Sequence, residues 1–101
     1  MSADPIEVDP GHYNVEFEND KVRVLRIRIA PGEKSVMHGH PDNVAVVLTD
    51  GRVRFDYPDG KSREIDIHAG DCEWQASGDH QPANVGDGPV EVLLVEIKPK
   101  T

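Results

Sequence analysis

Turn-forming residues interrupt this chain about every 8–12 residues, and this spacing is the strongest restriction on how it can fold. Between the turns, apolar and polar residues alternate, as at residues 13–17 and 53–57, and no window has a convincing helical period. The clearest turns are Glu18-Asn19-Asp20, Ala30-Pro31-Gly32, Pro58-Asp59-Gly60 and Gly86-Asp87-Gly88. The sequence therefore predicts an all-β fold of short antiparallel strands.

The alternation slips once, inside the strand expected at residues 22–29. Val22 and Val24 share one face, whereas Leu25, Ile27 and Ile29 share the other. A β-bulge near Val24 and Leu25 would turn both sets inward. The alternative is a strand that is apolar on both faces at one end. The intervening Arg23, Arg26 and Arg28 are expected to be solvated.

The middle of the chain is more apolar and leads into a predicted hairpin. Residues 44–48 form a continuous apolar run, which is typical of a strand covered on both faces. Asp50-Gly51 follows, and this dipeptide predicts a tight turn into the strand at residues 53–57.

Length and charge bound the domain organisation and the partners. With 101 residues, we expect an N-terminal arm at 1–12, with at most a short strand around Ile6 and Val8, and one domain at 13–101. The net charge of −8 argues against nucleic acid and against anionic membrane surfaces. No apolar run reaches the roughly 20 residues of a membrane span, and no signal region precedes the domain, so we expect a cytoplasmic protein.

Two histidines, His38 and His40, lie two residues apart between Gly32 and Gly51. In an extended strand such side chains point to the same face, with Cα atoms about 7 Å apart. Both rings can then converge on one metal ion.

These residues resemble the motifs of the cupin superfamily. Gly32, His38, His40 and Gly51 match the spacing of its first motif, in which Val44 takes the place of a glutamate. Gly70, Gly78, His80 and Asn84 partly match its second motif, with Ala76 in place of a proline and one residue fewer before the histidine. The resemblance implies a small single-domain bacterial cupin with a jelly-roll β-barrel, often a homodimer.

The same resemblance implies that His38, His40 and His80 converge inside the barrel as metal ligands. Three imidazoles suit a divalent transition metal such as Zn, Fe, Ni or Mn, and they leave a coordination position open for water or substrate. Without a carboxylate ligand the ion keeps its full charge, which favours anionic substrates. Asp42 or Asn43 is a candidate further ligand.

Two further residues are candidate walls of the pocket, Val44 and the only tryptophan, Trp74. The alternative for Trp74 is packing in the core or in a dimer interface. Cys72 is expected to be a small buried hydrophobe, and Glu73 is expected to be solvated on the opposite face from Trp74. His12 and His68 are expected on the surface.

Two functions of different class fit this pattern. The first is a metal-dependent enzyme, an oxygenase or an isomerase, that acts on a small molecule. The alternative is a non-catalytic module that binds a small ligand or a metal, and a purely structural dimer with an empty barrel is a third candidate. Sequence alone leaves the metal, the substrate and the reaction open.

Overall fold

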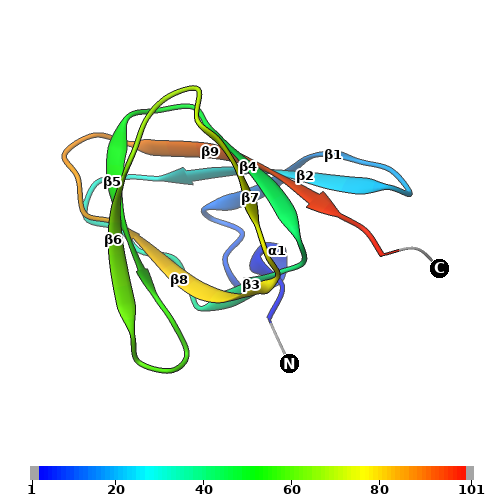
Figure 1. Cartoon of the computed structure of the whole chain (residues 1–101), viewed down its shortest axis with the longest axis horizontal. Helices are drawn as coiled ribbons and strands as arrows, with labels where there is room; N and C mark the ends of the chain where they lie inside the picture. The colour runs from blue at the N-terminus through cyan, green and yellow to red at the C-terminus, as the bar shows by residue number, and fades with distance from the viewer. Residues whose placement is uncertain (1–2, 100–101) are drawn as a thin grey trace.

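The structure, a computed structural model, describes residues 3–99. Within that range, nine strands pair antiparallel to form a five-stranded sheet in the order β1-β2-β9-β4-β7 and a four-stranded sheet in the order β3-β8-β5-β6 (Figure 1). The strands are β1 (Tyr13–Glu18), β2 (Val22–Ile29), β3 (His38–His40), β4 (Asn43–Val47), β5 (Gly51–Asp56), β6 (Ser62–Ile67), β7 (Cys72–Gln75), β8 (Gly78–Asn84) and β9 (Val90–Ile97). The all-β prediction is confirmed. The pairing joins the strands into two separate sheets, so it does not show the closed barrel that the resemblance implies.

The predicted N-terminal arm contains a helical turn, α1 (Pro5–Val8), where the sequence suggested at most a strand. The Asp4 carboxylate caps it by accepting the Ile6 amide, and Pro5 at the first helical position has no amide hydrogen to satisfy. Ile6 then packs against the core of the five-stranded sheet. No helix of residues 3–99 is long and apolar enough to cross a membrane.

The break in the alternation of β2 lies opposite a β-bulge in the neighbouring strand β1. The register of β1 against β2 shifts between Val15 and Phe17, opposite Leu25 and Val24. The extra residue therefore lies in β1, and Val24 remains on the face opposite to Leu25. The alternative interpretation, a strand that is apolar on both faces at one end, describes β2 correctly.

The hairpin predicted at Asp50-Gly51 is wrong. β4 pairs with β7 and β9, whereas β5 pairs with β6 and β8, so residues 48–50 cross from one sheet to the other. By contrast, the turn at Pro58-Asp59-Gly60 does join paired neighbours, β5 and β6. Gly60 adopts a φ of +86°, which only glycine takes readily.

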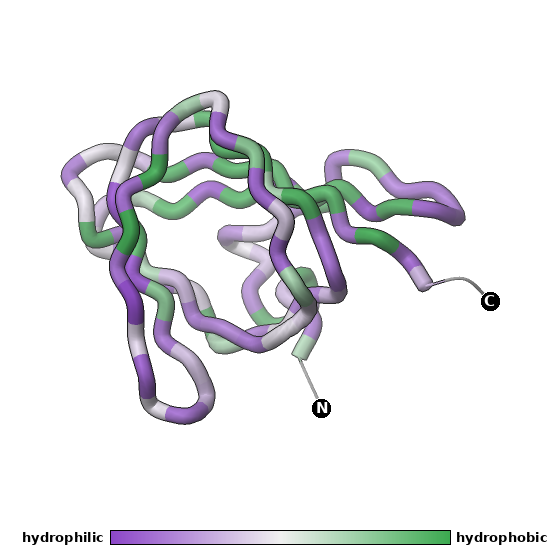
Figure 2. The backbone as a smooth tube through the Cα atoms, in the orientation of Figure 1, coloured by the Kyte–Doolittle hydropathy of each residue, from purple (hydrophilic) through white to green (hydrophobic). Residues whose placement is uncertain are grey.

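Two apolar clusters form the core between the sheets. Apolar residues recur at every second position along most of β2, whereas residues 92–95 of β9 are all apolar (Figure 2). One cluster gathers Tyr13, Leu25, Ile27, Ile29, Ala45 and Leu94, and the other gathers Val47, Val53, Ile67 and Val90.

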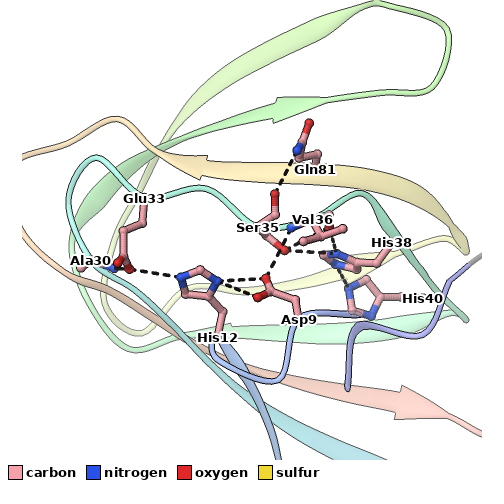
Figure 3. A network of polar contacts seen from close by, with 9 residues as sticks. All are labelled: Asp9, His12, Ala30, Glu33, Ser35, Val36, His38, His40 and Gln81. Atoms are coloured by element: carbon pink, nitrogen blue, oxygen red, sulfur yellow. Dashed lines mark hydrogen bonds and ion pairs between the residues drawn. The ribbon is translucent and has the colours of Figure 1, made fainter. Parts of the chain in front are cut away.

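His12 fastens the N-terminal segment to the loop that precedes β3 (Figure 3). Its Nδ1 lies 2.9 Å from Asp9 Oδ2, and its Nε2 lies 3.1 Å from Glu33 Oε1. Asp9 is buried and also accepts the Val36 amide. Burial alone would lower the pKa of His12, but the hydrogen bonds to Asp9 and Glu33 outweigh it and raise the pKa. His12 is therefore a structural link, contrary to its expected role as a bland surface residue.

This link makes the stability of the protein depend on pH through His12. Because the pKa is raised in the folded state, its contribution is complete below the unfolded pKa of about 6.5 and is lost as pH rises through the folded pKa. We expect His12→Ala to lower the free energy of unfolding by roughly 1–2 kcal/mol at pH 6 and by clearly less at pH 9. Urea titrations of both proteins at both pH values measure this.

The control for this experiment is His68→Ala, since His68 is exposed as predicted. That variant should leave the urea midpoint unchanged at either pH. An equal loss for His12→Ala at pH 6 and pH 9 would contradict the assignment.

Candidate metal centre

The pairing of β3 with β8 brings the three predicted histidines together. His38 lies directly opposite His80 in the register, and His40 follows two residues later on the same face of β3. One ring nitrogen from each lies within 4.8 Å of the others. The rings pack edge to face, with centroids 4.6 to 5.1 Å apart. The spacing between His80 and the rest of its motif does not prevent it from joining the cluster.

The partners of His38 and His40 set which ring nitrogen carries the proton. His38 Nδ1 lies 2.6 Å from the Val36 carbonyl oxygen, and His40 Nδ1 lies 2.6 Å from Glu96 Oε2. A carbonyl and a carboxylate can only accept, so both Nδ1 atoms must donate. In the neutral rings, each Nε2 atom then has no hydrogen and carries an unshared lone pair.

The two Nε2 atoms lie 2.9 Å apart, so their lone pairs face each other. Such an arrangement is repulsive unless a proton or a cation lies between the nitrogens. Burial lowers the pKa of His38 to about 4 and that of His80 to about 3, which disfavours extra protons on these two rings. Neutral imidazoles are the form that binds metals, so the residues present fit a divalent transition metal ion.

Outer partners hold the ligand rings in place. Tyr13 packs edge-on against His38 with ring centroids 4.7 Å apart, and Phe55 stacks on His80 at 5.1 Å. Ser35 is 2% exposed and its hydroxyl lies 3.3 Å from His38 Nδ1. The rings are therefore positioned before any ligand arrives.

A series of three charged side chains orients His40 through its Nδ1 atom. Glu96 Oε1 accepts from Arg23 Nε at 2.8 Å, and Arg23 also contacts both carboxylate oxygens of Asp4, the cap of α1. Burial would raise the pKa of Glu96, but the hydrogen bonds from His40 and Arg23 outweigh it and lower the pKa. Glu96 thus stays ionised at 2% exposure and fixes the orientation of His40. Arg23, expected to be solvated, is instead part of this support.

A cavity of about 80 Å³ lies between the two sheets and reaches the histidine cluster at His80. Its walls are mainly aliphatic and aromatic. The inward-facing side chains of the edge strand β7, Glu73 and Gln75, also line it. A small molecule in this cavity would meet the histidines at one end and a carboxylate on another wall.

Comparison with known proteins identifies the family of this chain. The family model of the cupin domain matches residues 25–96 of this chain. The chain is 34% identical over 86 residues to the β-alanine degradation protein BauB of Pseudomonas aeruginosa, covering 83% of this chain and 90% of BauB. This chain belongs to the cupin family.

Solved cupin structures share the fold. A cupin domain from Bordetella pertussis superposes with a TM-score of 0.80 at 28% identity, over 86% of this chain and 92% of that one. A Bacillus halodurans protein superposes with a TM-score of 0.68 at 19% identity, over 89% and 72% of the two chains. The second likeness concerns the fold alone.

Val44 and Trp74 do not line the cavity of this cupin. The register places Val44 opposite Trp74, and both point to the outer face of the five-stranded sheet, where Trp74 is 62% exposed. Their neighbours Ala45 and Glu73, also opposite each other, point inward and line the cavity. Glu73 is exposed on the opposite face from Trp74, as expected, and it also lines the cavity. Cys72 is exposed on the outer face, not buried.

The two candidate further ligands have different surroundings. Asp42 is exposed and accepts the Ser77 amide at 2.8 Å. Asn43 is 1% exposed and lies opposite Glu96 in the register. Its Nδ2 donates to the Pro41 carbonyl, while its Oδ1 has no hydrogen-bond partner among residues 3–99. Of the two, Asn43 is the one with a free buried oxygen.

Glu96 offers a test of the metal centre that leaves the three ligands untouched. We expect Glu96→Gln to weaken metal affinity about 10- to 100-fold, because the neutral amide no longer holds the His40 proton on Nδ1 as firmly. Competition with a chromophoric chelator measures the affinity. Glu91→Gln is the matched control, since Glu91 lies on the same strand but faces outward to Arg26. Equal affinities for the two variants would refute the role of Glu96.

Proposed function

We propose that this cupin binds one divalent transition metal ion through His38, His40 and His80 and uses it to act on a small molecule in the adjacent cavity. The observation that carries the proposal is that Nε2 of His38 and Nε2 of His40 lie 2.9 Å apart with their lone pairs facing each other, while His80 offers a third ring nitrogen beside them. Zn, Fe, Ni and Mn are the candidate ions. A cation held by these three neutral imidazoles would keep its charge and would supply Lewis acidity toward bound water or substrate.

The chain's own residues suit an anionic ligand with a short apolar portion. About 80 Å³ is roughly half the volume of a cavity that holds benzene, so it admits only a few non-hydrogen atoms. The aliphatic walls take the apolar portion, and a neighbouring cation favours an anionic head. BauB is named for β-alanine degradation, and a role on a small metabolite agrees with this size.

Glu73 favours an enzyme over a purely binding module. It supplies a carboxylate on the wall of the same cavity that His80 lines, so a group able to take or give a proton faces the ligand. We infer that the reaction is an oxygenation or an isomerisation. The alternative, a non-catalytic module that binds a ligand or a metal, has the same metal centre but no use for Glu73. A cytoplasmic location remains a prediction.

The metal content of the protein tests the proposal directly. Protein purified without a His tag should hold about one equivalent of a transition metal, measured by mass spectrometry of the elements, and should lose it in the His38→Ala/His80→Ala double variant. His68→Ala is the control and should keep the metal. Full occupancy in the double variant would rule out these ligands.

Ligand binding is tested by a matched pair of substitutions on β4. A ligand that binds only the folded protein raises its thermal midpoint, so a panel of small carboxylates and amino acids will show which are bound. Ala45→Leu fills the cavity and should abolish that shift while keeping the metal. Val44→Leu adds volume on the outer face and should keep both. A shift that survives Ala45→Leu would place the ligand elsewhere.

Glu73→Gln then separates the enzyme from the binding module. For any ligand found in the panel, an enzyme should lose turnover or oxygen uptake at least tenfold in this variant, with metal content and the thermal shift preserved. Absence of turnover in the unmodified protein, with the same ligands bound, would favour the module.

A further inference from the structure

A row of polar side chains crosses the inner face of the five-stranded sheet at the end nearest the histidines. Arg23 lies opposite Glu96 in the register, and Glu96 lies opposite Asn43. Asn43 in turn lies opposite Gln75 of β7, which lines the cavity. Directly opposed residues of an antiparallel sheet point to the same face. The row therefore runs from the support of His40 across β9 and β4 to the wall of the cavity.

Asn43 is the member of this row with an unused hydrogen-bonding atom. It is 1% exposed, and its Nδ2 donates to the Pro41 carbonyl oxygen at 3.0 Å. This bond fixes the orientation of the amide, because the reversed amide would bring two oxygen atoms together. The Oδ1 atom accepts no hydrogen bond from residues 3–99. Since a buried acceptor without a donor is costly, we expect a donor to reach it.

Among the register neighbours of Asn43 on the inner face, Gln75 is the one that can supply that donor. Glu96 offers only the oxygens of its carboxylate, and Ala45, two residues along β4, has no polar side-chain atom. Gln75 carries two N–H groups on its amide. Directly opposed Cβ atoms lie about 4.5–5.5 Å apart, a distance that a glutamine side chain can span. Rotation of the Gln75 side chain would therefore satisfy Oδ1 of Asn43.

That hydrogen bond decides what Gln75 presents to the cavity. Because Oδ1 of Asn43 can only accept, Gln75 must turn its Nε2 toward it, and its Oε1 is then left as an acceptor for a ligand. Glu73, two residues earlier on the same face of β7, adds a carboxylate, which also only accepts when it is ionised. Of the described residues that line the cavity, none is a lysine or an arginine. The β7 wall therefore suits a group that donates a hydrogen bond.

We propose that Gln75, oriented by Asn43, selects a short carboxylate whose other end carries a hydroxyl or amino group. The inference rests on the proposed function, in which the neighbouring cation favours the anionic head of the ligand. The donor at the other end would then meet Oε1 of Gln75 within a cavity of about 80 Å³. An acid of the same length without a donor leaves this acceptor unpaired, so it should bind more weakly.

Three acids with the same three-carbon chain test the selectivity. Propanoate has no donor at its far end, whereas 3-hydroxypropanoate and 3-aminopropanoate each carry one there. Calorimetric titration of the zinc-loaded protein should give dissociation constants for the two donor-bearing acids that are at least about fivefold lower than that for propanoate.

Gln75→Met keeps the length of the side chain and removes both of its polar atoms. It should reduce the preference to less than about twofold, because the acceptor is gone. Trp74→Met is the matched control, since Trp74 is the adjacent residue and points to the outer face. It should leave the preference unchanged, and circular dichroism checks that both variants are folded. A preference that arises from chelation of the metal by both ends of the ligand would survive Gln75→Met, and that result would overturn the proposal.

Asn43→Leu separates the orienting role of Asn43 from a role as a metal ligand. We expect this variant to lose the preference and to keep its metal affinity in competition with a chromophoric chelator. A loss of metal affinity with the preference kept would make Asn43 a ligand and overturn its role here.

The unmodified protein gives the same information without a substitution in the core. A hydrogen bond to the buried Oδ1 predicts that the side-chain amide protons of Gln75 exchange with solvent at least about tenfold more slowly than in an unstructured peptide, as measured by NMR. Exchange at the rate of the peptide would contradict the proposed pair.

Failure of this inference can be told apart from failure of the proposed function. If none of the three acids binds the zinc-loaded protein, or if binding does not require the metal, the proposed function is wrong and this inference falls with it. Equal dissociation constants for all three acids, with binding still lost when the metal is removed, would overturn the role of Gln75 alone.

Discussion

Nε2 of His38 and Nε2 of His40 lie 2.9 Å apart. In the neutral rings neither can donate a hydrogen bond to the other, because both Nδ1 atoms already carry the ring hydrogen and donate it elsewhere. The acceptor for His38 is local, the Val36 carbonyl two residues before it, whereas the acceptor for His40 is the Glu96 carboxylate at the end of β9. Glu96 in turn depends on Arg23 of β2, and Arg23 on Asp4 at the start of α1. These contacts hold the Nε2 atoms of His38 and His40 beside His80, with one ring nitrogen of each histidine within 4.8 Å of the others, and a cation among them would relieve the repulsion between the two lone pairs.

The histidine cluster could be predicted because its logic is local. Two residues on one strand share a face whatever the rest of the chain does, and the family motif supplied His80 as the third ring. The faces of β4 and β7 could not be assigned in the same way. The apolar run at 44–48 has no polar residue to mark its outer side, so nothing local distinguished Val44 from Ala45. In β7 the usual rule is reversed: Glu73 points inward and Trp74 outward, because β7 is an edge strand whose inner side borders a cavity rather than packed core.

Glu96 was missed, although a signal was present in the sequence. Val90, Val92, Leu94 and Glu96 have the same parity along β9, so a strand that buries the first three must also turn the glutamate inward. A carboxylate at the end of an apolar face needs a partner, and β2 offers Arg23 at the opposing register position. The error at Asp50-Gly51 has a different cause. A dipeptide predicts a turn, but which strands pair on either side of it is decided by the two sheets and not by the turn.

The same two-residue period separates two roles on one pair of strands. Ala45 and Glu73 face the cavity, and their immediate neighbours Val44 and Trp74 point to the outer face of the five-stranded sheet. β7 pairs with β4 alone among the described strands and contributes four residues, so it has little to hold it in place within one chain. None of the three histidines lies on β7. Movement of β7 should therefore alter ligand binding in the cavity before it alters the metal content, because it displaces the carboxylate of Glu73 and leaves the histidines in place.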